Sequence, residues 1–235
     1  MTETELKAIF TQHLRNYLNK CGQFLYSGID TLKRGDFYFV GFNPAKDGSN
    51  PKLADVRFDR LDWSAYTQQC WYCNLSIGCG LTTDCGRAVR KLHQRQVVRI
   101  MDELGLRPEE TFAANLVFVE SRSAIEVCND AFLLTSCWQV HKEMLATVRP
   151  KYIVCLGKGN YRSAFALIRR EDQEQTKVIV KSGFKKFVAT FDLGDRAPLT
   201  AMVIGVRHPS YPMNSSGLAD FMGLRKGKAK PQFAS

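Results

Sequence analysis

Two short apolar runs, far apart in the chain, each stop abruptly at a polar residue that is followed by proline. The first runs from Phe37 to Phe42 and ends at Asn43-Pro44, and the second runs from Ala201 to Val206 and ends at Arg207-His208-Pro209. Apolar runs of this length are typical of buried strands, and a proline just beyond them favours a turn. We therefore expect both strands to present a polar side chain at their carboxyl ends, as two walls of one pocket.

Apolar runs alternate with amphipathic helical patterns along the rest of the chain. We predict further strands at 113–119, 152–156 and 184–191, and helices at 5–20, 87–104, 131–148, 161–168 and 218–224. Strands that alternate with helices through short turns favour an α/β fold of three layers, α/β/α, with a central and mostly parallel sheet. We expect a single domain over residues 1–235, with a Cys-rich insert at about 58–86 and a basic tail at about 225–235.

The charge balance is strongly basic. The chain has 33 Lys and Arg against 23 Asp and Glu, a formal net charge of +10. Such a surplus favours a polyanionic partner, with nucleic acid ahead of a membrane. No uninterrupted apolar run approaches the length of a membrane span. The acidic start, Met1 to Glu5, lacks the basic-then-apolar order of a secretion signal. We expect a monomer that is cytoplasmic or nuclear and not secreted.

Four short motifs resemble those of the uracil-DNA glycosylase superfamily and occur in the same order. Gly41-Phe42-Asn43-Pro44 is similar to the Gly-x-Asn-Pro motif of its mismatch-specific and single-strand-selective branches, and His208-Pro209-Ser210 is similar to the His-Pro-Ser motif of the second catalytic loop. Between them, Ala114-Asn115-Leu116 stands where the family has a base-reading asparagine, and 153–157 resembles its late strand and glycine turn. The resemblance spans roughly residues 35 to 225 and implies the family's α/β fold and a DNA glycosylase activity.

The chain departs from the family pattern at two places that bear on the choice of base. Ala45 stands where these branches usually carry glycine, and the loop after His208 lacks the leucine commonly found two residues after Ser210. The resemblance leads us to expect hydrolysis of the glycosidic bond of a flipped base. The departures leave the base open between uracil and a related damaged or modified pyrimidine.

The resemblance implies catalytic roles for Asn43 and His208. The amide carbonyl of Asn43 suits the positioning of a water near C1′ of the sugar, although an amide is a weaker base than a carboxylate. A neutral imidazole at His208 suits a hydrogen bond to a carbonyl oxygen of the departing base. The alternatives are a turn-capping asparagine before Pro44 and a hydrogen-bonded histidine at a strand end.

Three further residues are expected to bind the base. Asn115 offers a donor and an acceptor that complement the edge of uracil or thymine, or it is a buried amide satisfied by the backbone. Phe58 follows Asn43 at about the interval of the family's base-stacking aromatic, with core packing as its alternative. Phe42 is expected to form part of the pocket wall.

The loop after His208 is expected to contact DNA. Ser210 and Ser215 suit phosphate contacts, and Tyr211 and Met213 lie where a side chain would replace the flipped nucleotide in the duplex. We prefer Met213 for this role because long apolar side chains fill such gaps. The alternative is an ordinary proline-containing turn.

Four cysteines lie close together in the insert, at Cys70, Cys73, Cys79 and Cys85. Four thiolates suit tetrahedral zinc or an iron–sulfur cluster, and unligated, partly buried thiols are the alternative. A metal there would order the insert and is not required for the chemistry.

Two patterns receive structural interpretations. Gly157 to Asn160 follows a strand, as phosphate loops do, but lacks the spacing of a nucleotide-binding motif and is interpreted as a tight turn. His13, His93 and His141 fall within helical patterns and are interpreted as ordinary helix residues.

The resemblance and the basic charge favour a DNA glycosylase acting in DNA repair. We expect it to be monofunctional, because no lysine is placed for Schiff-base chemistry. The alternatives are a catalytically inactive sensor of nucleic acid or nucleotides on the same fold, and a metal-stabilised protein-interaction module.

Overall fold

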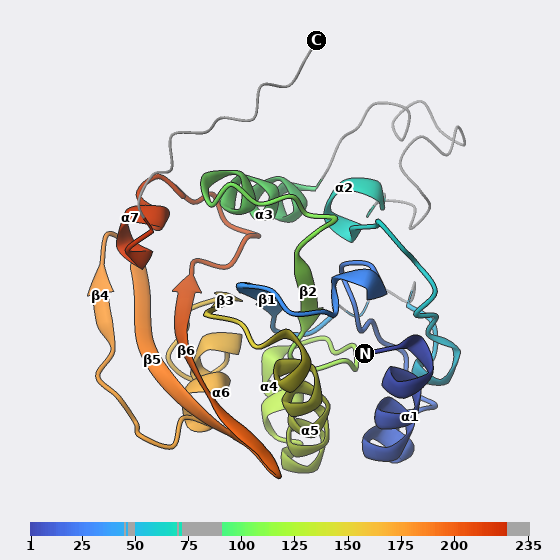
Figure 1. Ribbon diagram of the computed structural model, residues 1–235. Helices are drawn as coiled ribbons and strands as arrows, with labels where there is room; N and C mark the ends of the chain where they lie inside the picture. Colours follow the sequence, from blue (N-terminus) through green and yellow to red (C-terminus); the bar gives the residue numbers. More distant parts are fainter. Residues whose placement is uncertain (45, 47–49, 70, 72–90, 225–235) are drawn as a thin grey trace, which may run out of the picture.

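A six-stranded mixed sheet forms the centre of the molecule (Figure 1), seen in a computed structural model that describes residues 1–44, 46, 50–69, 71 and 91–224. The strand order is β2-β1-β3-β6-β5-β4. The first four are parallel, and β5 and β4 extend the sheet antiparallel on one side. The strands are β1 (Phe37–Gly41), β2 (Phe112–Asn115), β3 (Tyr152–Leu156), β4 (Ile179–Lys181), β5 (Phe184–Leu193) and β6 (Arg196–Val206). The mostly parallel sheet covered by helices confirms the predicted α/β class.

Helices cover both faces of the sheet, which gives three layers (Figure 1). The α-helices are α1 (Glu3–Leu14), α2 (Ala65–Gln68), α3 (Leu92–Glu103), α4 (Ala124–Cys128), α5 (Ala131–Val148), α6 (Ala164–Arg170) and α7 (Leu218–Met222), with short 3₁₀ turns η1 (Arg15–Tyr17), η2 (Ile29–Thr31) and η3 (Leu53–Asp55). Side chains of α1, α5 and α6 share one apolar cluster, and those of α2, α3 and α7 share a second.

Strand β1 shows why its sequence is apolar without alternation. Tyr38 and Val40 belong to the cluster on the α1 and α5 side, whereas Phe39 belongs to the cluster on the α3 side. A central parallel strand is buried on both faces, so every position favours an apolar residue. The strand ends where Gly41 leads into Asn43, at the carboxyl edge of the sheet.

Helix α5 has the predicted bounds because its ends carry clear signals. The Asp130 carboxylate accepts a hydrogen bond from the backbone N–H of Leu133 at the first turn. The helix stops at Arg149, which adopts a left-handed conformation at φ 50° just before Pro150.

Other boundaries differ from the prediction. The helix predicted at 5–20 ends at Leu14 and is followed by the 3₁₀ turn η1. The strand predicted at 113–119 pairs in the sheet only as far as Asn115. Strand β4 was not predicted, because it has three residues and all of them are exposed. Of the helix predicted at 87–104, only the part from 91 onward is described, and it begins at Leu92.

The segment before β1 runs beside the outer edge of β2. Asn115 N–H donates to the Phe24 carbonyl at 3.2 Å, and Tyr26 N–H donates to the Ala113 carbonyl at 2.8 Å. This irregular pairing covers the edge of β2 and brings Gln23 and Tyr26 to the carboxyl end of the sheet.

His141, on helix α5, holds the end of β2 in place by hydrogen bonds. Its Nε2 lies 3.0 Å from the Asn115 carbonyl and 3.1 Å from the Leu116 carbonyl, so Nε2 carries the proton. Nδ1 then accepts a 2.6 Å hydrogen bond from the Tyr38 hydroxyl. Complete burial lowers the pKa of His141 to about 4, so the ring is neutral at pH 7. His141 is thus a buried anchor that joins α5, β1 and β2, and it lies within a helix, as the sequence interpretation had it.

Within the described residues, no helix combines the length and the apolar character that a membrane span requires.

Candidate active site

A cavity of about 390 Å³ lies at the carboxyl ends of the parallel strands. Five of the predicted site residues line it, and they come from three strand ends: Phe42, Asn43, Asn115, His208 and Ser210. The structure therefore brings together the two proline-terminated strand ends from which the prediction started. This is the edge at which open α/β sheets bind ligands.

The Asn43 amide is held by its nitrogen. Nδ2 donates to the Pro44 carbonyl at 2.8 Å and to Ser121 Oγ at 2.9 Å. Ser121 Oγ in turn donates to the Ser123 carbonyl at 2.8 Å. Because both amide hydrogens are committed, the orientation of the Asn43 amide is fixed and Oδ1 is its acceptor for a further ligand. Ser121 lines the same cavity, and the sequence analysis did not identify it as a site residue.

Asn115 is almost completely buried at the floor of the cavity, with 3% of its surface exposed. Its Nδ2 donates to the Gln23 carbonyl at 3.3 Å and to the Tyr26 hydroxyl at 3.2 Å. Its Oδ1 lies against Gly41, where a Cβ would approach to 2.8 Å. Glycine at position 41 therefore leaves room for the Asn115 amide, and the acceptor Oδ1 is the atom left for an N–H of a ligand.

Phe58 lies elsewhere. It is buried against Phe10 and Phe24, with ring centroids 5.7 and 5.3 Å away, and it lines a neighbouring cavity rather than the one that holds Asn43. Phe58 is therefore a residue of the apolar core, and it is not placed to stack on a base beside Asn43.

The aromatic wall of the Asn43 cavity comes from other residues. Tyr26 stacks on Tyr66 at 5.5 Å, and Trp71 meets Tyr26 edge-on at 5.8 Å. All three line the cavity together with Phe42. The Phe42 prediction agrees with this placement, whereas the three other rings could be assigned only once the chain was folded, since nothing in their spacing marks them as neighbours of Asn43.

The ring of His208 is held in one tautomer. The backbone N–H of Ser210 donates to Nδ1 at 3.3 Å, which leaves the proton on Nε2 in the neutral ring. Burial lowers the pKa of His208 below its ordinary value of 6.5, so the ring is neutral at pH 7. Beside it, Gly157 adopts φ +136°, and a Cβ there would lie 3.8 Å from His208 Cδ2. The site thus presents a neutral imidazole as an Nε2–H donor.

His93 is a site residue that sequence reasoning missed. Its ring packs edge-to-face on His208 with centroids 5.3 Å apart, and Trp71 packs on it at 5.1 Å. Burial, with a smaller contribution from His208, lowers the pKa of His93 to about 3. The helical pattern around His93 gave no signal for this role, because its neighbour lies 115 positions away in sequence.

The loop after His208 differs from the prediction in which side chain protrudes. Tyr211 is 56% exposed, and the Arg207 guanidinium lies over its ring at 5.3 Å. Met213 is half-buried and packs against the apolar cluster on the α3 and α7 side. Tyr211, rather than the preferred Met213, is therefore the exposed side chain beside the site. Ser210 lines the cavity, and Ser215 lies at the turn into α7, where its carbonyl accepts from Leu218 N–H.

A second cavity, of about 470 Å³, shares Asn43 and His208 with the first and is basic. Lys158, Arg162 and Arg207 line it. Burial and the neighbouring charges of Lys185 and Arg207 lower the pKa of Lys158. The tight turn at Gly157 thus carries a lysine whose surroundings favour an anion.

The four cysteines at Cys70, Cys73, Cys79 and Cys85 lie outside the described residues, so the zinc or iron–sulfur prediction stays a prediction. Among the residues that are described, no group of three or more His, Cys, Asp or Glu side chains is arranged to hold a metal ion.

No protein-family model matches this chain, and no curated protein matches it either.

Proposed function

We propose that this protein is a monofunctional DNA glycosylase that hydrolyses the N-glycosidic bond of uracil or of a related damaged or modified pyrimidine in DNA. The observation that carries the proposal is the presence of a fixed amide at Asn43 and a neutral Nε2–H donor at His208 in the wall of one cavity. The resemblance of the Gly-x-Asn-Pro and His-Pro-Ser motifs to the uracil-DNA glycosylase superfamily supports it.

Base removal passes through a sugar with oxocarbenium character, and negative charge moves onto the departing base. Asn43 Oδ1 accepts a hydrogen bond from a water and holds it near C1′ while the glycosidic bond breaks. His208 Nε2–H donates to a carbonyl oxygen of the base and stabilises the charge there. The water supplies the hydroxyl to C1′ and its proton to the base.

The target nucleotide must leave the helical stack to reach this cavity. Asn115 Oδ1 at the floor accepts from an N–H of the base, which matches the N3–H of uracil or thymine. The cations Lys158, Arg162 and Arg207 beside Asn43 and His208 suit the phosphates of the strand. The net charge of +10 favours the same polyanion.

The test is release of free base from oligonucleotides that carry uracil or other modified pyrimidines, in single-stranded and duplex form. We expect release from at least one substrate, and a loss of roughly 100-fold or more for Asn43→Ala and His208→Ala, because each removes a group that acts in the transition state. His13→Ala is a matched control on a residue outside the cavity. Binding to DNA without release of any base would favour the sensor instead.

A further inference from the structure

A third cavity, of about 290 Å³, adjoins the Asn43 cavity and has a different chemistry. The two share Gln23, Asn50 and Gln69 in their walls. The basic cavity at Lys158 shares Asn43 and His208 with the first. The Asn43 cavity therefore adjoins both of the others, the basic cavity at Lys158 and the third cavity.

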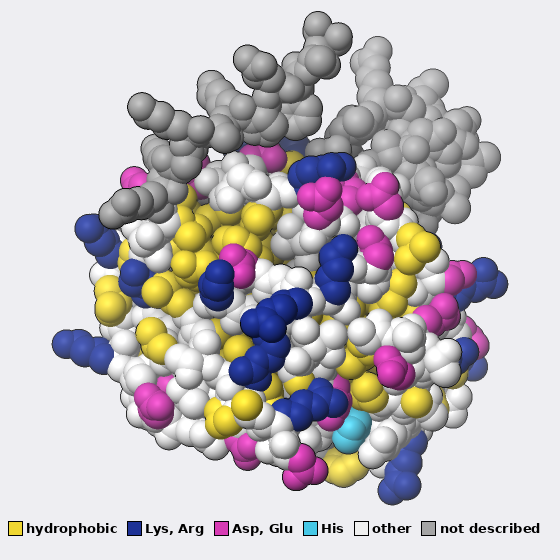
Figure 2. All heavy atoms as spheres, viewed as in Figure 1, with side chains coloured by type: hydrophobic (Ala, Val, Ile, Leu, Met, Phe, Trp, Pro, Cys, Tyr) yellow, Lys and Arg dark blue, Asp and Glu magenta, His cyan; other side chains and the backbone are white. Residues whose placement is uncertain are grey.

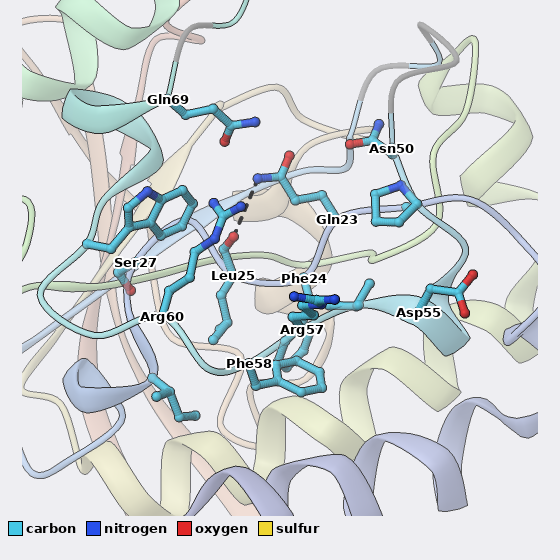
Figure 3. Close-up of a pocket in the computed structure, with 15 residues that line it drawn as sticks. Gln23, Phe24, Leu25, Ser27, Asn50, Asp55, Arg57, Phe58, Arg60 and Gln69 are labelled. Atoms are coloured by element: carbon cyan, nitrogen blue, oxygen red, sulfur yellow. Dashed lines mark hydrogen bonds between the residues drawn. The ribbon is translucent and has the colours of Figure 1, made fainter. Parts of the chain in front are cut away.

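The outer wall of the third cavity offers an aromatic ring and two cations. Trp63 is half-buried, and the Arg60 guanidinium lies over its ring at 4.3 Å. Arg57 is exposed and lines the same cavity. Neither arginine forms an ion pair within the described part of the chain. The carboxylate in the wall, Asp55, lies at the opposite end from Arg60 (Figure 3).

The wall shared by the two cavities holds a polar atom that has no partner among the described residues. Gln69 Oε1 is buried and forms no hydrogen bond among the described residues. Figure 3 shows the Gln69 side chain pointing toward Gln23. Gln23 Nε2 donates a hydrogen bond to the Leu25 carbonyl at 3.4 Å. A buried acceptor without a donor costs free energy, so the site is complete when a ligand supplies an N–H.

These features match one ligand class. An aromatic ring with a guanidinium over it, a second arginine without an ion pair to the described residues, and an acceptor for an N–H are what a nucleotide needs: a surface for the base, a charge for the phosphate and a partner for its amino or imino group. Because the cavity adjoins the one proposed to take the flipped base and shares three side chains with it, the nucleotide next to the flipped one is the part of the strand nearest to it.

We propose that the cavity between Trp63 and Gln69 binds the nucleotide adjacent to the flipped one. The Trp63 ring and the Arg60 guanidinium stacked over it pack against its base, Arg57 binds its phosphate, and Gln69 Oε1 accepts from its N–H. The inference rests on the proposed glycosylase function and adds a subsite that makes excision depend on a flanking nucleotide on one side of the target.

The experiment uses three substrates with the same target base: one flanked on both sides, one truncated on the 5′ side and one truncated on the 3′ side. The full-length protein is compared with Arg57→Gln and Trp63→Ala. We expect one of the two truncations to lower kcat/KM, and each variant to lower kcat/KM roughly tenfold on the fully flanked substrate. On the truncated substrate that lacks the bound nucleotide, the variants should match wild type.

Arg34→Gln is the matched control, because it removes the same charge at an exposed position next to the amino end of β1. Arg57 is exposed, so Arg57→Gln tests the cavity even where Trp63→Ala lowers stability. An equal loss of kcat/KM on all three substrates would overturn the proposal. The cavity would then belong to the flipped base itself and would make room for a bulky substituent on that base. Unchanged kcat/KM in both variants would also overturn it.

A binding measurement separates this inference from the proposed function. Fluorescence anisotropy with an uncleaved single-stranded oligonucleotide needs no catalysis. Arg57→Gln should weaken binding and make the log–log salt dependence less steep by about 0.7, whereas Arg34→Gln should not. If no base is released but Arg57→Gln still weakens binding, the glycosylase proposal fails and the nucleotide subsite stands. Equal affinity for wild type and Arg57→Gln would remove the subsite.

Discussion

Ser121 is the residue on which the orientation of Asn43 depends. Its hydroxyl accepts from Asn43 Nδ2 and donates to the Ser123 carbonyl, so it holds the amide without being placed at the reacting atoms. We predict that Ser121→Ala lowers kcat roughly tenfold with little change in KM, because one hydrogen bond that fixes the amide is lost.

Ser121→Thr, which keeps a hydroxyl, should restore most of the rate, and Ser216→Ala is a control outside the cavity. Single-turnover and steady-state base release measure both parameters. A Ser121→Ala enzyme with an unchanged kcat would show that Asn43 does not need this contact.

The pH profile of activity reports the protonation of His208. Burial lowers its pKa below 6.5, so the neutral ring persists to a lower pH than in an ordinary histidine. The neutral Nε2–H form is the one proposed to act, so we predict that kcat/KM is level at neutral pH and falls only below pH 6.5. A fall that begins above pH 6.5 on the acid side would contradict this role.

At the scale of the elements, the anchor at His141 links stability to pH. Its folded-state pKa is about 4, and the ordinary value is 6.5. Between these values the unfolded chain binds a proton that the folded chain does not, so stability is present above pH 6.5 and is lost as the pH falls toward 4. The full effect is about 3 kcal/mol at 1.36 kcal/mol per pH unit.

We therefore predict that the urea midpoint of wild type falls between pH 7 and pH 5. His141→Gln should be less stable at pH 7, since Tyr38 and two carbonyls lose their partner, and its midpoint should depend less on pH. The dependence that remains includes the contribution of His93, whose pKa of about 3 has the same sign. Equal pH dependence in the variant and wild type would exclude His141 as the source.

The elements also show how far the sequence could predict the fold. Strand β1 and helix α5 follow from local signals, namely an unbroken apolar run and a capped helix before proline. Strand β4 could not be predicted, because a three-residue exposed edge strand exists only through its pairing with β5. The end of β2 at Asn115 depends on two hydrogen bonds with residues far away in sequence: Asn115 N–H donates to the Phe24 carbonyl, and His141 Nε2–H donates to the Asn115 carbonyl.

The site was predictable in part for the same reason. Asn43, Asn115 and His208 stand at strand ends, and parallel strands bring their carboxyl ends to one edge. His93, Ser121 and Gln69 could not be found, since their roles depend on contacts across the fold. Phe58 was assigned from an interval in the sequence, and an interval does not reveal that Phe10 and Phe24 surround its ring.

At the scale of the whole molecule, the basic surplus predicts salt-sensitive DNA binding. Figure 2 shows Lys and Arg side chains gathered in a band across one face. Three cations line the basic cavity, which shares Asn43 and His208 with the Asn43 cavity. If each neutralises one phosphate of a single strand, the affinity should fall with salt with a log–log slope of about −2, measured by anisotropy. A slope near zero would contradict a phosphate-based interaction and favour a protein-interaction module.

Single-turnover release of free base shows whether Asn43 and His208 together act in hydrolysis of a glycosidic bond, as proposed. With enzyme in excess over a labelled uracil-containing oligonucleotide, we expect a measurable rate for wild type and a loss of roughly 100-fold or more for Asn43→Ala and for His208→Ala, with His13→Ala unchanged. Rates in the two variants that equal the wild-type rate would exclude this role for both residues.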